Sequence, residues 1–160
     1  MMKKTDTIMA IKIEPDKYPE LIKLDDDDTL EEQLADIVHG DIECIYPFSD
    51  DHVVLICDEE GKCKMQTKNR AILDEETGEL RDIICGTFVI SGVPAGDQEG
   101  LVSLTQEQLQ KYCGLFRQPE LITTSTTSKG DIMVHISRHE ENVLVGDAKD
   151  TIVVPWKPGM

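Results

Sequence analysis

Residues 82–90, with the sequence DIICGTFVI, form the longest apolar run in the chain, and the fold depends on where this run lies. A second run, HVVLIC at residues 52–57, follows a turn at residues 47–51. Continuous apolar runs of this length are typical of strands that are covered on both faces. We therefore expect the two runs to lie side by side in the middle of one sheet, with Gly86 marking a bulge or a close backbone approach.

Alternating apolar residues predict further strands around these runs. The alternation covers residues 7–13, 21–24 and 42–46, and the last of these should pair antiparallel with residues 52–57. Residues 64–73 are polar by comparison, and we expect them to be a connection with room for one helical turn.

Two capping boxes predict helices that would cover the sheet. In the first, Thr29 caps the helix and Glu32 reaches back, and Gly40 follows as a stop. In the second, Thr105 and Gln108 repeat the pattern. The apolar faces behind these caps consist of Leu30, Leu34, Ile37 and Val38, and of Leu109, Tyr112, Cys113 and Phe116.

The predicted fold class is α+β, with a mostly antiparallel sheet of about 4–6 strands covered by two amphipathic helices. We expect a compact domain over residues 1–120 and a Thr/Ser-rich linker over 121–130. A β-rich extension over 131–160 would form a small meander on the sheet or a loosely attached tail. Its candidate strands are residues 132–136, 143–145 and 152–154.

The charge balance restricts the partners. The 32 acidic and 16 basic residues give a formal net charge of −16, which disfavours direct binding to nucleic acid or to anionic membranes and favours a basic protein partner or cations. The same charge is also explained by solubility alone. No stretch approaches the ~20 apolar residues of a membrane span, and no apolar segment of a signal peptide follows the N-terminal lysines, so we expect a cytoplasmic protein.

The five cysteines are an odd number without framework spacing, which favours a reducing compartment. Only Cys63, after a turn, is expected to be exposed. The cysteines that lie within apolar patterns are expected to be small buried residues: Cys44, Cys57, Cys85 and Cys113.

The motifs favour no catalysis, no cofactor and no metal site. The run Asp25-Asp26-Asp27-Asp28 fails as a calcium loop, since Leu30 stands where glycine is needed, and its aspartates are better explained by the N-terminus of the following helix. His135 and His139 have metal-binding spacing only on a helix, whereas a strand is predicted there. Ser91 lacks the glycines of a nucleophile elbow, and no phosphate-binding loop is present.

One polar segment is a candidate binding site. Arg70 could bind a carboxylate or phosphate with Asn69 donating beside it, and Gly86 and Thr87 would complete the site. The structural alternative is that Asn69 caps a short turn and that Arg70 forms an ion pair within the protein.

The order of several segments is similar to that of a known family. These segments are residues 34–43, 54–62, 69–71, 82–88 and 103–108, and together they resemble bacterial and phage proteins catalogued as domain of unknown function three-eight-four-six. The resemblance covers roughly residues 8–120 and implies a mobile-element protein without an assigned activity. The family pattern has a proline shortly before the Asn-Arg pair, whereas Gln66-Thr67-Lys68 stands here.

These observations lead to two functional hypotheses. The first is a non-enzymatic accessory protein of a mobile element that acts through protein contacts, in its sharper form as an acidic mimic of nucleic acid. The alternative is a small-ligand or nucleotide-binding module that uses Asn69 and Arg70.

Overall fold

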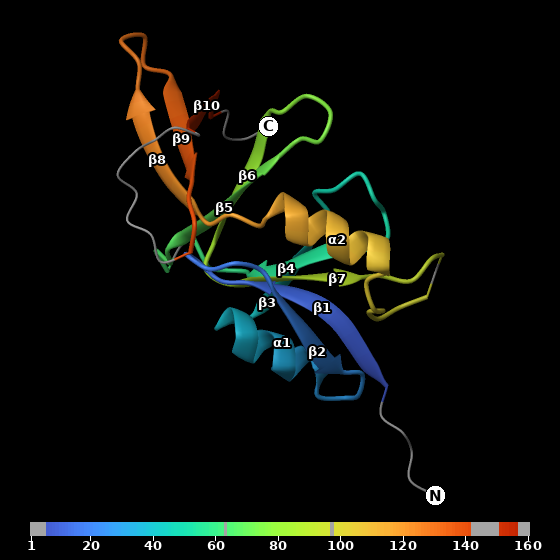
Figure 1. Ribbon diagram of the computed structural model, residues 1–160. Coiled ribbons are helices and arrows are strands. Elements are labelled where there is room, and N and C mark those ends of the chain that lie inside the picture. Colours follow the sequence, from blue (N-terminus) through green and yellow to red (C-terminus); the bar gives the residue numbers. More distant parts are fainter. Residues whose placement is uncertain (1–5, 63, 97, 142–150, 157–160) are drawn as a thin grey trace, which may run out of the picture.

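The structure is a computed structural model that describes residues 6–62, 64–96, 98–141 and 151–156 (Figure 1). Its elements, in chain order, are β1 (Thr7–Ile13), β2 (Glu20–Asp25), α1 (Leu30–Val38), β3 (Ile42–Ile45), β4 (Val53–Asp58), β5 (Lys68–Leu73), β6 (Leu80–Cys85), β7 (Phe88–Gly92), α2 (Gln106–Leu115), β8 (Glu120–Thr126), β9 (Ile132–Arg138) and β10 (Thr151–Pro155).

Five strands form one antiparallel sheet in the order β2-β1-β7-β4-β3. β7 pairs with β4, with Leu55 opposite Ile90, so the prediction that the two apolar runs lie side by side is confirmed for residues 89–90. It is wrong for residues 83–85, which belong to β6 and pair with β5 in a separate sheet. The chain changes sheets at Gly86, whose φ of 79° is a left-handed conformation that favours glycine.

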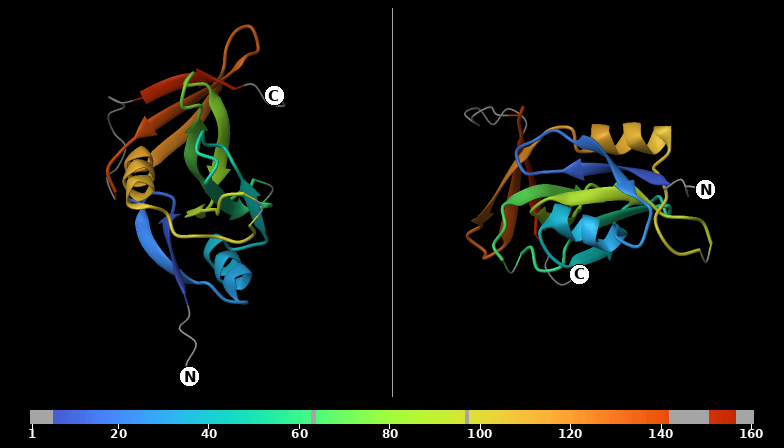
Figure 2. Two further views of the ribbon diagram at one scale, coloured as in Figure 1. Left: turned by 90° about the vertical axis from the view of Figure 1, so that its right-hand side faces the viewer. Right: turned by 90° about the horizontal axis from the view of Figure 1, so that it is seen from below.

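The two helices cover opposite faces of the five-stranded sheet (Figure 2). On one face, Leu34 of α1 packs in a cluster with Val54 and Val89. On the other face, Tyr112 of α2 packs in a cluster with Leu55. The α+β class, the antiparallel pairing and the two helices are as predicted, although five further strands lie outside the main sheet. No helix in the described ranges is long and apolar enough to cross a membrane.

The prediction that residues 64–73 form a polar connection is wrong for most of this segment. Residues 68–73 form β5, which pairs antiparallel with β6. Asn69 and Arg70 made this segment polar in sequence, yet both are fully buried. A buried polar strand is tolerated only where its hydrogen bonds are satisfied, and the contacts described below satisfy them.

The C-terminal strands form a third sheet in the order β10-β9-β8, which packs against the β5–β6 hairpin (Figure 1). Ile122, Val134 and Ile136 share an apolar cluster with Ala71 and Ile83. The linker prediction is therefore corrected for residues 121–126, which lie in β8, because threonine is β-branched and suits strands as well as linkers. The predicted strand at residues 143–145 lies outside the described residues. The division into domains at residue 120 stays a prediction.

The two predicted capping boxes have different outcomes. At α2, the Thr105 side chain accepts from the Gln108 backbone N–H, and the Gln108 side chain accepts from Thr105, which confirms the box. At α1, Thr29 makes no capping hydrogen bond from its side chain, so that prediction is wrong. There Asp27 accepts from both the backbone N–H and the hydroxyl of Thr29, and Gln33 donates to that hydroxyl.

Candidate functional site

Asn69 and Arg70 lie next to each other in β5, both with an exposed fraction of 0%. The Asn69 amide donates from Nδ2 to the carbonyl oxygens of Ile13 and Gly86, each at 2.9 Å. These bonds join β5 to the end of β1 and to the point where the chain changes sheets. Asn69 therefore links segments that lie far apart in the sequence and does not cap a turn.

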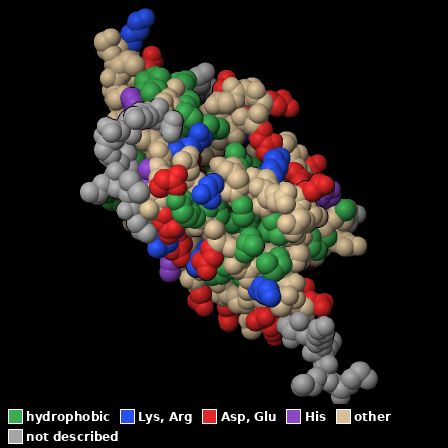
Figure 3. Space-filling model, viewed as in Figure 1, with side chains coloured by type: hydrophobic (Ala, Val, Ile, Leu, Met, Phe, Trp, Pro, Cys, Tyr) green, Lys and Arg blue, Asp and Glu red, His purple; other side chains and the backbone are tan. Residues whose placement is uncertain are grey.

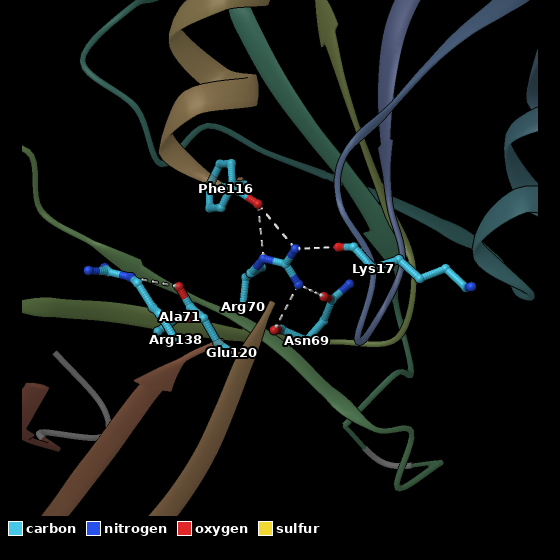
Figure 4. A network of polar contacts seen from close by, with 7 residues as sticks. All are labelled: Lys17, Asn69, Arg70, Ala71, Phe116, Glu120 and Arg138. Carbon is cyan, nitrogen blue, oxygen red and sulfur yellow. Dashed lines mark hydrogen bonds and ion pairs between the residues drawn. The ribbon is translucent and has the colours of Figure 1, made fainter. Parts of the chain in front are cut away.

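The Arg70 guanidinium donates all of its N–H groups to oxygens of the same chain (Figure 4). Nε and Nη2 donate to the Phe116 carbonyl at 3.3 and 3.1 Å, and Nη2 also donates to the Lys17 carbonyl at 2.7 Å. Nη1 donates to the side-chain oxygen of Asn69 at 2.7 Å and to its carbonyl at 3.4 Å. Burial lowers the pKa of Arg70 to about 10, against the opposing effect of Glu120 and Asp16, so the group remains charged at neutral pH.

A buried carboxylate, Glu120, completes this network on the side of the third sheet (Figure 4). One oxygen accepts from the Ala71 backbone N–H at 2.9 Å, and the other lies 3.5 Å from Nε of Arg138. Burial raises the pKa of Glu120, and the hydrogen bonds from Ala71 and Arg138 and the positive charges of Arg138 and Arg70 only partly offset this. Glu120 could not be predicted from the sequence, because its partners Ala71 and Arg138 are distant in sequence and no local motif marks it.

The structure brings Asn69, Arg70 and Gly86 together, with Thr87 directly after Gly86 and nearly buried. These residues belong to a hydrogen-bond network that joins β5 to the region around the end of β1, to Gly86 and to the end of α2. The polar groups of Asn69 and Arg70 already have hydrogen-bond partners within the chain. Binding of a ligand to these two residues stays a prediction.

The acidic run Asp25–Asp28 lies where β2 leads into α1, and all four residues are exposed. The hydrogen bonds from the hydroxyl and backbone N–H of Thr29 lower the pKa of Asp27. Gln33 accepts from the Asp25 backbone N–H and donates to its carbonyl. Figure 3 shows acidic side chains along the edge of the molecule where α1 lies.

Beside this run is a groove of about 450 Å³ between α1 and the segment after β7, which we call the α1 groove. Its floor is the apolar face of β3 and β4, its walls include apolar residues of α1 and of the segment after β7, and carboxylates stand at one rim. The floor consists of Ile42, Cys44, Val54 and Ile56, the walls include Leu30, Leu34, Val93 and Leu101, and the rim carboxylates are Asp27, Asp28 and Glu31.

The α1 groove exposes two residues of the β3 segment. Tyr46, directly after β3, has an exposed fraction of 62%. Cys44 is also exposed, so the prediction of a buried Cys44 is wrong. The reason is that β3 is an edge strand, and α1 leaves its outer end uncovered.

The other described cysteines differ from Cys44. Cys57 is buried as predicted, and burial raises the pKa of its thiol to about 12. Cys85 and Cys113 are only half-buried, and Cys63 lies outside the described residues. Within the part of the chain that the structure describes, no group of three or more His, Cys, Asp or Glu side chains could hold a metal ion.

Comparison with known proteins gives the family. No curated protein and no solved structure matches the chain. Residues 7–117, which run from the start of β1 to just beyond α2, match the family described as Domain of unknown function (DUF3846). The match includes the five-stranded sheet, both helices and the buried pair in β5. Since it spans well over half of the 160 residues, the chain belongs to the DUF3846 family.

Proposed function

We propose that this protein is a non-enzymatic protein-binding module that holds a basic, apolar segment of a partner in the α1 groove. The observation that carries the proposal is the groove itself, which has a volume of about 450 Å³ and combines an apolar floor with a carboxylate rim. Exposed apolar surface bordered by charge is typical of protein–protein contact sites.

The floor supplies the apolar part of such a contact. Tyr46 is a large exposed aromatic residue at the groove, and tyrosine is one of the residues that contribute most to binding energy at interfaces. Val54 and Ile56 of the floor are fully buried in β4, so they support the exposed surface from the core of the sheet. A rigid surface loses little conformational entropy when it binds.

The carboxylates of the rim would determine which partner segments bind. Asp27, Asp28 and Glu31 add three negative charges on one side, and none of the described residues that line the groove is basic. A partner segment with lysine or arginine beside leucine-like residues matches both features, because opposite charges both steer association and reject acidic competitors. The setting in a mobile element, which the family resemblance implies, stays a prediction.

The other hypotheses have less support from the geometry. Nucleic-acid mimicry rests on the net charge of −16, which any arrangement of the same residues would have. A small ligand at Asn69 and Arg70 would have to displace bonds to Phe116, Lys17 and Ile13 that join the elements of the fold.

The test uses a short amphipathic peptide of leucine and lysine as the probe, with a leucine–glutamate peptide of equal length for comparison. Binding is measured by fluorescence anisotropy of the dye-labelled peptide. We expect the lysine peptide to bind and the glutamate peptide not to bind. The triple variant Asp27→Asn, Asp28→Asn, Glu31→Gln should weaken binding roughly ten-fold, since exposed charge pairs contribute about 0.2–1 kcal/mol each.

A matched control removes three charges elsewhere. Glu76, Glu79 and Asp131 are exposed and lie outside the groove, and their replacement by Gln, Gln and Asn changes the net charge equally. This control should bind the lysine peptide as the unmodified protein does. Equal weakening by both triple variants would mean that total charge, and not the groove, attracts the peptide, and would overturn the proposal.

A further inference from the structure

A second cavity, of about 530 Å³, lies at the open end of the small core between the β5–β6 hairpin and the third sheet. We call it the Trp156 pocket. Ile83 and Cys85 of β6 form one wall, and Thr124, Ile132 and Trp156 come from the third sheet and its end. Its volume is in the range of cavities that hold small organic molecules.

The pocket gathers apolar surface that the fold leaves in contact with water. Met65 at its mouth has an exposed fraction of 89% and Ile132 one of 41%. Trp156, the single tryptophan of the chain, is only half-buried. Large apolar side chains around one cavity are typical of a ligand site, whereas single exposed ones elsewhere need no explanation.

The charge at the mouth is opposite to that of the protein. Among the described residues that line the pocket, Lys62 and Lys68 are basic and none is acidic, although acidic residues outnumber basic ones two to one in the chain. Lys62 pairs with Asp82, whereas Lys68 makes no ion pair with another described residue. The charge of Lys62 is therefore offset by Asp82. Because salt screens charges beyond about 8 Å, Lys68 contributes more to the potential at the mouth than distant carboxylates do.

The mouth is held in place before any ligand arrives. The buried carboxylate of Asp58 accepts from Gln66 Nε2 at 2.7 Å, from Lys64 Nζ at 2.9 Å and from the Glu60 backbone N–H at 2.9 Å. Burial would raise the pKa of Asp58, but the bonds from Lys64 and Glu60 outweigh it and lower that pKa. Gln66 thus lines the pocket with a side chain that is held by Asp58.

From the apolar walls and from Lys68, which forms no ion pair with a described residue, we propose that the Trp156 pocket binds a small amphipathic anion, a carboxylate with an apolar chain or ring. The apolar body lies between Ile83 and Ile132, and the carboxylate accepts from Lys68. This site is separate from the α1 groove, and neither proposal depends on the other.

The experiment titrates the full chain with dodecanoate and records the fluorescence of Trp156, which reports on this pocket alone. Dodecyltrimethylammonium, which has the same chain and the opposite charge, is titrated in parallel, and circular dichroism checks that the fold is retained. We expect a saturable change in emission with dodecanoate. The Lys68→Gln variant should weaken binding up to about five-fold, as expected for the loss of one exposed charge pair.

Two further variants make the result decisive. Lys23→Gln removes an exposed charge from β2, outside the pocket, and should leave dodecanoate binding unchanged. Thr124→Phe places a ring in the cavity from an exposed position of β8 and should abolish binding. The proposal is overturned by the absence of a saturable response, by an equal response to the cationic amphiphile, or by equal effects of Lys68→Gln and Lys23→Gln.

Discussion

Arg70 donates two hydrogen bonds to the main-chain carbonyl of Phe116, 46 residues further along the chain, and so fixes the end of α2 to β5. The Lys17 carbonyl is held by the same guanidinium, which thereby joins the segment after β1 to the other two elements. The buried Asn-Arg pair is thus a structural centre of the region that matches the family.

Replacement of Arg70 by lysine tests this role. Lysine keeps the charge but lacks the planar fork, so it cannot reach Phe116, Lys17 and Asn69 at once. We expect Arg70→Lys to lower the free energy of unfolding by about 2–4 kcal/mol in urea denaturation. Arg117→Lys, at an exposed neighbouring position, should change it by less than about 0.5 kcal/mol. Equal stability of the two variants would contradict the structural role.

The role of Gly86 in the turn before β7 can be tested against Gly78, which lies between β5 and β6 and has a similar backbone conformation. Their φ angles are 79° and 74°, so alanine is strained at both by about 1–2 kcal/mol. At Gly86 an added Cβ would also lie 1.7 Å from Oε1 of Gln66, whereas nothing lies within 4 Å at Gly78. We expect Gly86→Ala to lower the free energy of unfolding by about 1 kcal/mol more than Gly78→Ala, because the Gln66 side chain must give up its hydrogen bond to Asp58. Thermal denaturation measures the stability of both variants. Equal losses of stability would contradict this prediction and show that Gln66 moves without cost.

Glu120 predicts a pH dependence. Its pKa in the folded protein is raised above the ordinary 4.5 by burial, so its protonated form favours folding. The stabilisation is complete below about pH 4.5 and is lost as the pH rises through the raised pKa. As the pH rises through this pKa, the free energy of unfolding of the unmodified protein should therefore fall relative to that of Glu120→Gln. Urea denaturation at several pH values measures it, and a difference that does not change with pH would contradict the assignment.

Apolar patterning was sufficient for the elements whose residues pack by their apolar faces. Strand β1 and both helices follow from alternation or from helical spacing, because apolar burial determines where they lie. Strands β4 and β7 lie in continuous apolar runs, although the run at residues 82–90 did not show that residues 83–85 belong to another sheet. β5 could not be found in this way. Asn69 and Arg70 are buried through hydrogen bonds to carbonyls up to 56 residues away, and such partners leave no local pattern.

The capping motifs show how neighbouring residues change the outcome of a local rule. Thr105 has no competitor and forms its box with Gln108. Thr29 has the same spacing to Glu32, but Asp27 accepts from its hydroxyl and its backbone N–H. The aspartate two residues before the motif therefore decided the result. Likewise, Cys44 lies in a regular alternation, and only its place on an edge strand explains its exposure.

The α1 groove has a built-in reporter in Cys44, which lines its floor and is exposed. Partial burial and the nearby Glu43 raise the pKa of this thiol, so its alkylation is best followed at mildly alkaline pH. The most direct test measures the rate of maleimide labelling of Cys44 by mass spectrometry, with and without the leucine–lysine peptide. We predict that the peptide slows labelling of Cys44 while Cys113, outside the groove, keeps its rate. Bound peptide with an unchanged Cys44 rate would contradict binding in the groove.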